Sequence, residues 1–279
     1  TIIKQASEKG KLDFLMKSIS FSNFLRRFGI DLRKLIFRDI MKSFGYRFPM
    51  MAVGGAPVNA QRMSFLSSVG FNIYVGYGLT EASPIVAINS DIFHFPDSVG
   101  SCVGDTECKI VEPDCSGVGE IAIRGSNITK GYYKDENATA ASFKDGWFLT
   151  GDYGRLDQNG RLYISGRKKN LIILDNGKNI CPEVLEDFFR ENSPLFSEAV
   201  VFERTKTSGK ESTKLLVLAV SIDREYSRGK SEEQLREEAF TEVYRLNRLL
   251  PSYERIADVM AVAHEFEKTS TLKIIRRSV

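Results

Sequence analysis

Two short strands that each run into a glycine loop constrain the fold of this chain more than any other feature. The apolar segment Met50–Val53 leads into Gly54-Gly55-Ala56-Pro57, and a helix is expected over residues 58–69. A second apolar segment, Phe71–Val75, leads into the loop Gly76–Ser83. Short apolar runs bounded by glycine are typical of buried strands. The pattern therefore predicts an α/β fold in which two strands each deliver a glycine loop.

The segments on either side of this unit differ in character. Residues 1–45 carry apolar residues at helical spacing together with many basic residues, which predicts helices packed on a sheet. An amphipathic helix lying on a membrane surface is the alternative, although interspersed aspartates such as Asp13 and Asp31 count against it. Residues 98–166 show short β-segments broken by glycines, with a hairpin turn at Asn159-Gly160.

The pattern changes again after Arg167. A β-hairpin around the turn Asp175–Lys178 is followed by a helix that opens at Pro182. Strands are expected at Glu198–Glu203, Leu215–Ile222 and Ala257–Ala263, and one helix face carries Leu235, Ala239, Val243, Leu246 and Leu250. We expect an α/β part over residues 1–94, a β-rich part over 95–166, a boundary at 167–169, and a compact α+β unit over 170–279.

Composition excludes several classes of protein. The 39 basic and 36 acidic residues nearly cancel, so no nucleic-acid partner is expected. No apolar run approaches the ~18 residues that span a bilayer. The spacing of Cys102, Cys108 and Cys115 matches no standard zinc finger, which favours free thiols in a reducing compartment. We therefore expect a cytoplasmic protein, with peripheral membrane association as the alternative; its oligomeric state stays open.

The loop Gly76–Ser83 carries the most specific chemistry. Gly76 and Gly78 free the backbone for close approach to a ligand. Tyr77 offers an aromatic face, Thr80 a hydroxyl and Glu81 a carboxylate. A ring for a base, a donor for phosphate and an oxygen ligand for Mg²⁺ together suit a nucleotide.

The sequence GYGLTEASP resembles the signature of the adenylate-forming superfamily, which includes acyl-CoA synthetases, peptide-synthetase adenylation domains and luciferases. The resemblance implies that Tyr77 stacks on adenine, Thr80 contacts the phosphates and Glu81 holds Mg²⁺. The block formed by Gly54, Gly55, Ala56 and Pro57 is similar to the family's loop beside the adenine.

Two further blocks follow in the family's order. Asp152, in Thr-Gly-Asp, resembles the aspartate that binds the ribose hydroxyls, and Arg167 resembles the arginine that contacts the ribose. Lys169 falls where the family has its hinge residue, although Asn170 replaces the commoner acidic neighbour. Gly177 lies in a segment similar to the hairpin that lines the pantetheine tunnel, where a glycine lets a narrow thiol arm pass.

The last block, residues 267–277, contains Thr271-Leu272-Lys273, which is similar to the ending of long-chain acyl-CoA synthetases. The resemblance implies that Lys273 serves adenylation as a cation aimed at developing negative charge. Nothing in residues 1–48 resembles the family's Ser/Thr/Gly-rich loop with a lysine, which cradles the β- and γ-phosphates. We therefore expect a C-terminal portion of the enzyme that is inactive alone.

The resulting hypothesis is an ATP-dependent acid–thiol ligase that activates a fatty acid as its acyl-adenylate and transfers the acyl group to coenzyme A. Two alternatives remain. One is an adenylation domain that loads a carrier protein; the other is a non-catalytic module that has kept the fold.

Overall fold

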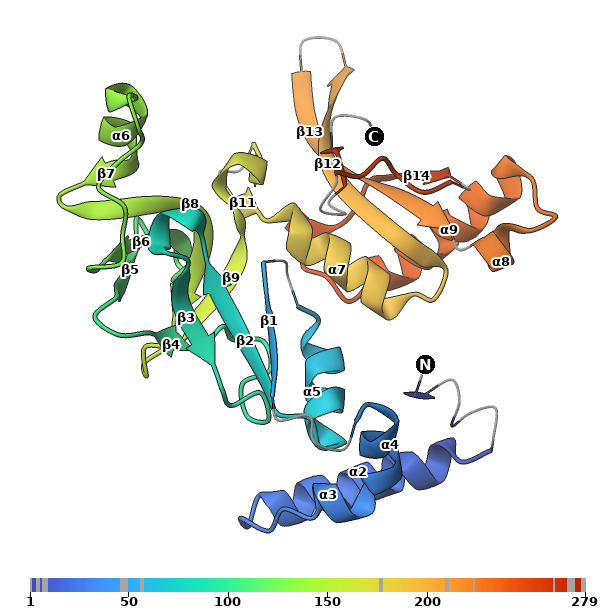
Figure 1. Ribbon diagram of the computed structural model, residues 1–279. Coiled ribbons are helices and arrows are strands. Elements are labelled where there is room, and N and C mark those ends of the chain that lie inside the picture. Colours follow the sequence, from blue (N-terminus) through green and yellow to red (C-terminus); the bar gives the residue numbers. More distant parts are fainter. Residues whose placement is uncertain are drawn as a thin grey trace. The chain divides into compact units, whose positions relative to one another are not determined.

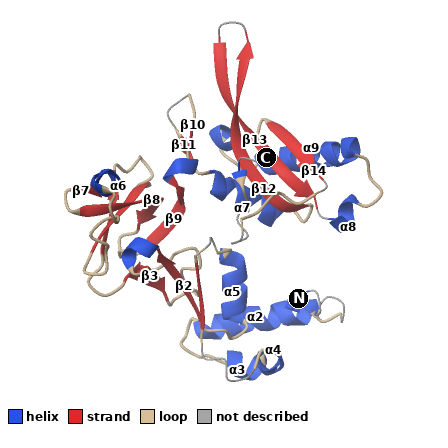
Figure 2. Ribbon diagram, turned by 45° about the horizontal axis from the view of Figure 1, so that its top comes forward, coloured by secondary structure: helices blue, strands red, loops and turns tan. Residues whose placement is uncertain are grey.

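The structure is a computed structural model, and it describes residues 2–3, 6, 10–45, 50–55, 58–175, 178–208, 211–222, 224–262, 264–269 and 274–276. The chain forms two compact units, whose elements are shown in Figure 1 and Figure 2. Unit 1 comprises residues 1–150 and 154–164, and unit 2 comprises residues 151–153 and 165–279.

Residues 12–43 of unit 1 contain the helices α2 (Leu12–Arg26), α3 (Arg33–Ile36) and α4 (Arg38–Ser43). Their buried residues, such as Leu15 and Met41, join an apolar core with residues of the first sheet, as the packed-helix interpretation predicted. Other large apolar residues of these helices are exposed, among them Phe14, Phe21, Phe24 and Leu35, and so is Phe28 in the turn between α2 and α3. No helix among the described residues is both long and apolar enough to cross a bilayer. Membrane association of this surface stays a prediction.

The first sheet has the order β1-β2-β3-β4, with β1 (Met51–Gly54), β2 (Ile73–Gly78), β3 (Ile85–Asn89) and β4 (Ser101–Cys102). Strands β1 and β2 are parallel and are joined through α5 (Ala60–Ser68), while β3 and β4 run antiparallel. The expected strand–helix–strand unit is confirmed. Strand β2 continues to Gly78, beyond the expected end at Val75, because Gly76 pairs with Gly54 on one side and with Ile88 on the other.

The β-rich part of the chain forms a curled half-barrel sheet in the order β5-β6-β8-β7, with β9 pairing β8. Most of this sheet belongs to unit 1, whereas residues 151–153 of β8 and 165–167 of β9 belong to unit 2. Its elements are β5 (Glu107–Val111), β6 (Gly119–Arg124), α6 (Glu136–Ser142), β7 (Phe143–Lys144), β8 (Trp147–Leu156) and β9 (Leu162–Arg167). The turn predicted at Asn159-Gly160 joins β8 to β9; Gly160 has φ +73° there. The carboxylate of Asp157 accepts from the Asn159 and Arg161 amides and closes that turn.

Unit 2 contains a three-stranded sheet in the order β12-β13-β14, with β12 and β13 antiparallel and β13 and β14 parallel. Its elements are η2 (Lys168–Asn170), β10 (Ile172–Ile173), β11 (Asn179–Ile180), α7 (Pro182–Asn192), β12 (Phe196–Ser208), β13 (Glu211–Ile222), α8 (Arg224–Ser227), α9 (Glu232–Asn247), η3 (Ser252–Glu254) and β14 (Asp258–Val262). Each strand and helix predicted in this region is present, with β12 and β13 longer than expected. The predicted face of the second helix extended too far, because α9 ends at Asn247 and Leu250 lies beyond it, just before Pro251.

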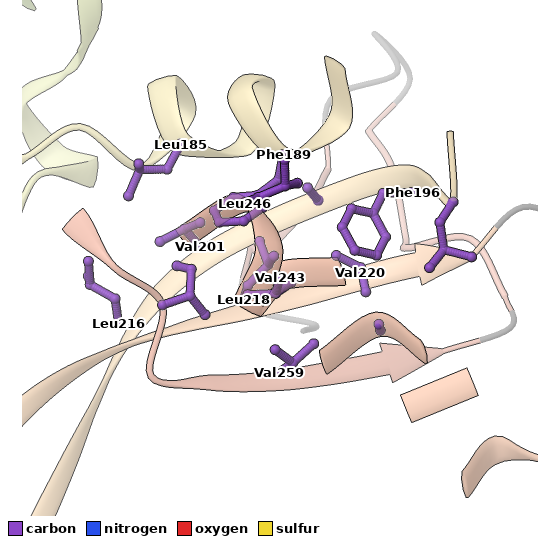
Figure 3. Packing of buried hydrophobic residues seen from close by; sticks show 14 of the residues in the cluster. Leu185, Phe189, Phe196, Val201, Leu216, Leu218, Val220, Val243, Leu246 and Val259 are labelled. Atoms are coloured by element: carbon purple, nitrogen blue, oxygen red, sulfur yellow. The ribbon is translucent and has the colours of Figure 1, made fainter. Parts of the chain in front are cut away.

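The two faces of this sheet bury different partners. Leu185 and Phe189 of α7 pack with α9 and with alternate strand residues such as Val201 and Leu218, as Figure 3 shows. The neighbouring strand residue Val200 belongs to a second cluster on the other face, together with Ala219 and Phe266. Successive strand residues point to opposite faces, so both clusters follow from the alternation of the sequence. Unit 2 therefore has its own core, and Phe266 and Ile274, in the described chain after β14, pack on the face opposite α7 and α9.

Candidate functional site

The glycine loop predicted after β2 is a tight reversal of the chain. A Cβ at Gly78 would lie 1.9 Å from the Pro84 carbonyl oxygen, a contact with backbone that no side chain can relieve. The Leu79 amide donates to that same oxygen at 2.8 Å, and the 3₁₀ turn η1 (Thr80–Ala82) follows. Glycine is therefore required at position 78 for the chain to fold back and present Thr80 and Glu81.

Residues 127–132 form hydrogen bonds to the glycine loop at residues 81 and 82. The Asn127 side chain donates to the Ala82 carbonyl at 2.9 Å, and the Thr129 amide donates to the Glu81 carbonyl at 2.7 Å. The Tyr132 hydroxyl donates to Glu81 Oε1 at 2.9 Å. Burial raises the pKa of Tyr132, and its bond to the Glu81 carboxylate raises that pKa further. The tyrosine therefore stays a protonated donor, and it fixes the direction of the carboxylate.

The donor set around Glu81 fits a magnesium ion that is shared with a nucleotide. Mg²⁺ is usually bound by one or two carboxylates together with substrate phosphates. Within the described part of the chain, no three His, Cys, Asp or Glu residues form a group that could hold a metal by itself. The described cysteines are free thiols. A carboxylate oriented by a phenol, beside the exposed Thr80, matches the shared type of site.

The loop after β1 is described as far as Gly55. A Cβ at Gly54 would lie 2.8 Å from the carbonyl oxygen of Gly76, its partner in β2. Gly55 has φ +80°, in the left-handed region that favours glycine. The two loops predicted to approach a nucleotide thus leave neighbouring strands of one sheet. Ala56 and Pro57 lie outside the described residues.

Tyr77 and Asp152 are placed on strands. Tyr77 lies in β2 and packs partly against the apolar cluster that contains Val86 and Ile121. Asp152 lies in β8, in unit 2, and is 5% exposed. Its Oδ1 lies 2.8 Å from Nε of Arg167 at the end of β9. The structure therefore brings the two residues predicted to contact a ribose into one ion pair.

A buried carboxylate beside a half-exposed guanidinium can accept hydrogen bonds from two adjacent hydroxyls. Charged acceptors make stronger hydrogen bonds than neutral ones. Because the Arg167 side chain is about half exposed, it balances the Asp152 charge while keeping part of its donor capacity toward solvent.

Lys169 lies exposed in η2, two positions after the Arg167 that pairs with Asp152. Its role as a hinge stays a prediction. The predicted hairpin is present, since Ile172 pairs with Ile180 and Ile173 with Asn179. Its turn residue Gly177 lies outside the described residues, as does Lys273.

Tyr132 is the residue that the sequence analysis missed. It follows Gly131 and precedes a second tyrosine, and it lies fifty-one positions from Glu81. Only the fold brings it beside the glycine loop, so no local pattern marks it.

Comparisons with known proteins match both units. A profile described as AMP-binding enzyme matches residues 8–133, and a profile described as AMP-binding enzyme C-terminal domain matches residues 169–279. The chain belongs to the AMP-binding enzyme family.

Relatives in this family carry acid–CoA ligase names. The chain is 40% identical over 168 residues to long-chain-fatty-acid–CoA ligase FadD15 of Mycobacterium bovis, covering 60% of this chain and 27% of that protein. It is 34% identical over 209 residues to long-chain-fatty-acid–CoA ligase ACSBG2 of Xenopus laevis, covering 74% and 28%. The chain thus spans little more than a quarter of the length of these two relatives.

Solved structures of AMP-binding enzymes share the fold. The o-succinylbenzoate CoA synthetase MenE from Bacillus subtilis, in complex with the acyl-adenylate intermediate OSB-AMP, superposes with a TM-score of 0.68 at 24% identity. The match covers 88% of this chain and 49% of MenE. The ATP-bound RpMatB-BxBclM chimera B1 gives a TM-score of 0.68 at 22% identity, covering 87% and 48%. The fold class predicted from the sequence is confirmed.

Proposed function

We propose that this protein is an AMP-forming long-chain fatty acid–CoA ligase. In the first half-reaction, an oxygen of the fatty acid carboxylate attacks the α-phosphorus of ATP, and pyrophosphate leaves as acyl-adenylate forms. In the second half-reaction, the thiol sulfur of coenzyme A attacks the acyl carbon, and AMP leaves as the thioester forms. The names of two relatives, at 40% and 34% identity, support this activity, although the chain spans 27% and 28% of those proteins.

The observation that carries the proposal is the Glu81 carboxylate, held by Tyr132 at the end of a loop that only glycine can form. We assign adenine stacking to Tyr77, phosphate contact to Thr80 and the Mg²⁺ ligand to Glu81. When bound, Mg²⁺ would neutralise negative charge on the phosphates. Gly54 and Gly55 would let the neighbouring loop approach the base closely.

Unit 2 carries the remaining proposed roles. Asp152 would accept the ribose hydroxyls, with Arg167 as its paired cation. Lys273 would place its ammonium against the charge that develops between carboxylate and α-phosphate. Lys169 would act as the hinge, and Gly177 would lie beside the pantetheine arm in the second half-reaction.

Two rival functions make different predictions. A domain that loads a carrier protein would form acyl-adenylate but would transfer it to a carrier rather than to free coenzyme A. A non-catalytic module would form no acyl-adenylate. The retained side chains at Tyr77, Glu81, Asp152 and Lys273 argue against the second rival, because such a module has no chemical need of all four.

The full-length protein should be tested with ATP, Mg²⁺ and palmitate, with free coenzyme A or a pantetheinylated carrier as acceptor. We expect thioester formation with free coenzyme A. Lys273→Ala should lower ATP–pyrophosphate exchange about 10²–10³-fold, the usual effect of losing one well-placed electrostatic contact. It should leave thioester formation from supplied acyl-adenylate largely intact. Lys230→Ala is the control, because Lys230 pairs with Glu238 in α9.

Equal damage to both half-reactions by Lys273→Ala would reject the assignment of Lys273. We further propose that the 279-residue chain forms no acyl-adenylate alone, because its sequence contains no recognisable Ser/Thr/Gly-rich phosphate loop. Exchange at the rate of the full-length protein would show that the β- and γ-phosphates bind elsewhere.

A further inference from the structure

The described residues on both sides of 270–273, which are 264–269 and 274–276 and are here called the terminal segment, form hydrogen bonds and ion pairs with the rest of unit 2. On the preceding side, the buried Glu198 carboxylate accepts from the Phe266 amide at 2.8 Å and pairs with Lys268. Lys268 forms a β-bridge with Ile274, and the Ile275 amide donates to the Glu267 carbonyl at 2.8 Å. The two sides are therefore joined to each other next to Lys273.

On the following side, Arg276 forms a two-pronged ion pair with Glu186 in the second turn of α7. Arg276 Nη1 lies 2.6 Å from Glu186 Oε1, and Nη2 donates to Oε2 at 2.8 Å. A second carboxylate of α7, Glu183, lies 3.3 Å from the same guanidinium. Arginine has a planar fork that matches a carboxylate in this way, which a lysine cannot reproduce.

Both members of this pair also bind the same residue of β12. Strand β12 is an edge of its sheet in the described part of unit 2, so the peptide groups along that edge need partners. The Val201 amide donates to Glu186 Oε1 at 2.7 Å, and Arg276 donates to the Val201 carbonyl at 3.2 Å. The pair therefore joins the terminal segment, helix α7 and strand β12 in one closed set of hydrogen bonds.

The electrostatics make Arg276 hard to replace. The Glu186 side chain is only 13% exposed. Burial raises the pKa of Glu186, while the Arg276 guanidinium opposes that rise. A buried ion pair that loses one partner leaves an uncompensated charge. The Arg276–Glu186 ion pair therefore holds the terminal segment in one position, because its two parallel hydrogen bonds allow only one arrangement of the guanidinium and the carboxylate.

We propose that Arg276 is a positioning residue for Lys273, and that its pair with Glu186 fixes the chain from which Lys273 reaches the first half-reaction. The inference rests on the proposed function of Lys273. Only three positions separate the two residues, so freedom at Arg276 passes to the Lys273 backbone. A misplacement of about 1 Å in a catalytic group costs about 10²-fold in rate.

The test compares Arg276→Gln, Arg276→Lys and Arg190→Gln in the full-length protein. Arg190 is the matched control, because it pairs with Asp187 in α7, the helix that carries Glu186. In the described part of the chain, Arg190 is not among the residues that hold residues 264–276. We expect Arg276→Gln to lower kcat for ATP–pyrophosphate exchange about 10²-fold with KM for ATP unchanged. Arg276→Lys should recover part of the loss, and Arg190→Gln should have no effect. Thioester formation from supplied acyl-adenylate should be unchanged in all three.

A double variant separates positioning from a general structural role. If Arg276 acts through Lys273, Arg276→Gln added to Lys273→Ala should cause no further loss of exchange. A further 10²-fold loss, or equal damage to both half-reactions, would overturn the inference. If Arg276→Gln does not fold, Arg276→Lys becomes decisive, and an unchanged exchange rate in that variant would likewise overturn it. Absence of exchange in the unaltered protein, or an unchanged rate in Lys273→Ala, would instead reject the proposed function.

Discussion

Removing the Asp152 carboxylate should weaken AMP binding in the full-length protein. The structure supplies the reason, because Asp152 is 5% exposed and its Oδ1 lies 2.8 Å from Nε of Arg167. Under the proposed function, the carboxylate accepts the two ribose hydroxyls. Hydrogen bonds to a charged group contribute about 1.5–3 kcal/mol. At about 1.4 kcal/mol per factor of ten, Asp152→Ala should raise Kd for AMP about 10- to 150-fold.

The same substitution should have little effect on folding. Arg167 is left without its carboxylate, but its side chain is 52% exposed and can be hydrated. The buried member of the pair is the one removed, so no buried charge is left uncompensated. We therefore expect the free energy of unfolding to fall by less than the about 3–5 kcal/mol seen when a buried charge loses its partner.

Isothermal titration calorimetry with AMP measures the first effect, and urea denaturation measures the second. Asp152→Asn should fall between the unaltered protein and Asp152→Ala, because an amide keeps one acceptor oxygen but not the charge. Asp157→Asn is the matched control, since Asp157 pairs with Arg161 in the turn between the same two strands. It should leave Kd for AMP within twofold. If a folded Asp152→Ala protein also binds AMP within twofold, Asp152 only balances the charge of Arg167.

Two further substitutions test the site and the core. Tyr132→Phe removes the hydroxyl that donates to Glu81, so the Mg²⁺ concentration needed for half-maximal ATP–pyrophosphate exchange should rise about 10-fold. Tyr133→Phe, at the exposed neighbouring residue, should leave that Mg²⁺ concentration unchanged. An equal rise in both variants would contradict the role of Tyr132. Phe189→Ala empties a fully buried position in unit 2 and should lower the free energy of unfolding by about 3–5 kcal/mol in urea denaturation, whereas the half-exposed Phe240 should tolerate alanine within about 0.5 kcal/mol. A similar cost at both phenylalanines would mean that the packing in Figure 3 is not the core of this unit.

The periodic parts of the sequence predicted their structure well, because local pattern determines them. Leu235, Ala239, Val243, Leu246 and Leu250 were predicted as one helix face. The first four are the buried residues of α9, whereas Leu250 is buried after the helix has ended at Asn247. The end of β2 was predicted too early. Two glycines within three residues suggest a loop, since glycine is unfavourable in strands. Pairing on both sides of Gly76 overrides that preference.

The partners of the functional residues could not be predicted from local sequence. Tyr132 reaches Glu81 only because the fold brings residues 127–132 against the glycine loop. Arg276 could be seen only as one of two arginines after the Lys273 motif. Its role depends on Glu186, ninety positions earlier, and on the edge of β12. Residue types indicated the chemistry, while the contacts that orient those residues are long-range.

Because the two units have separate apolar cores, these experiments can distinguish damage to the nucleotide loop from a change at the Lys273 segment. Tyr77 and the glycine loops belong to unit 1, and the Arg276–Glu186 pair belongs to unit 2. The apolar clusters follow the same division, with Phe71 and Ile121 in unit 1 and Phe189 in unit 2. Arg276 belongs to neither apolar cluster of unit 1, so we expect its substitution to leave the packing around the loop at Glu81 unchanged. If such a variant loses only the first half-reaction while its unit 2 stays folded, damage to the nucleotide loop cannot explain the loss, and the position of the Lys273 segment remains as its cause.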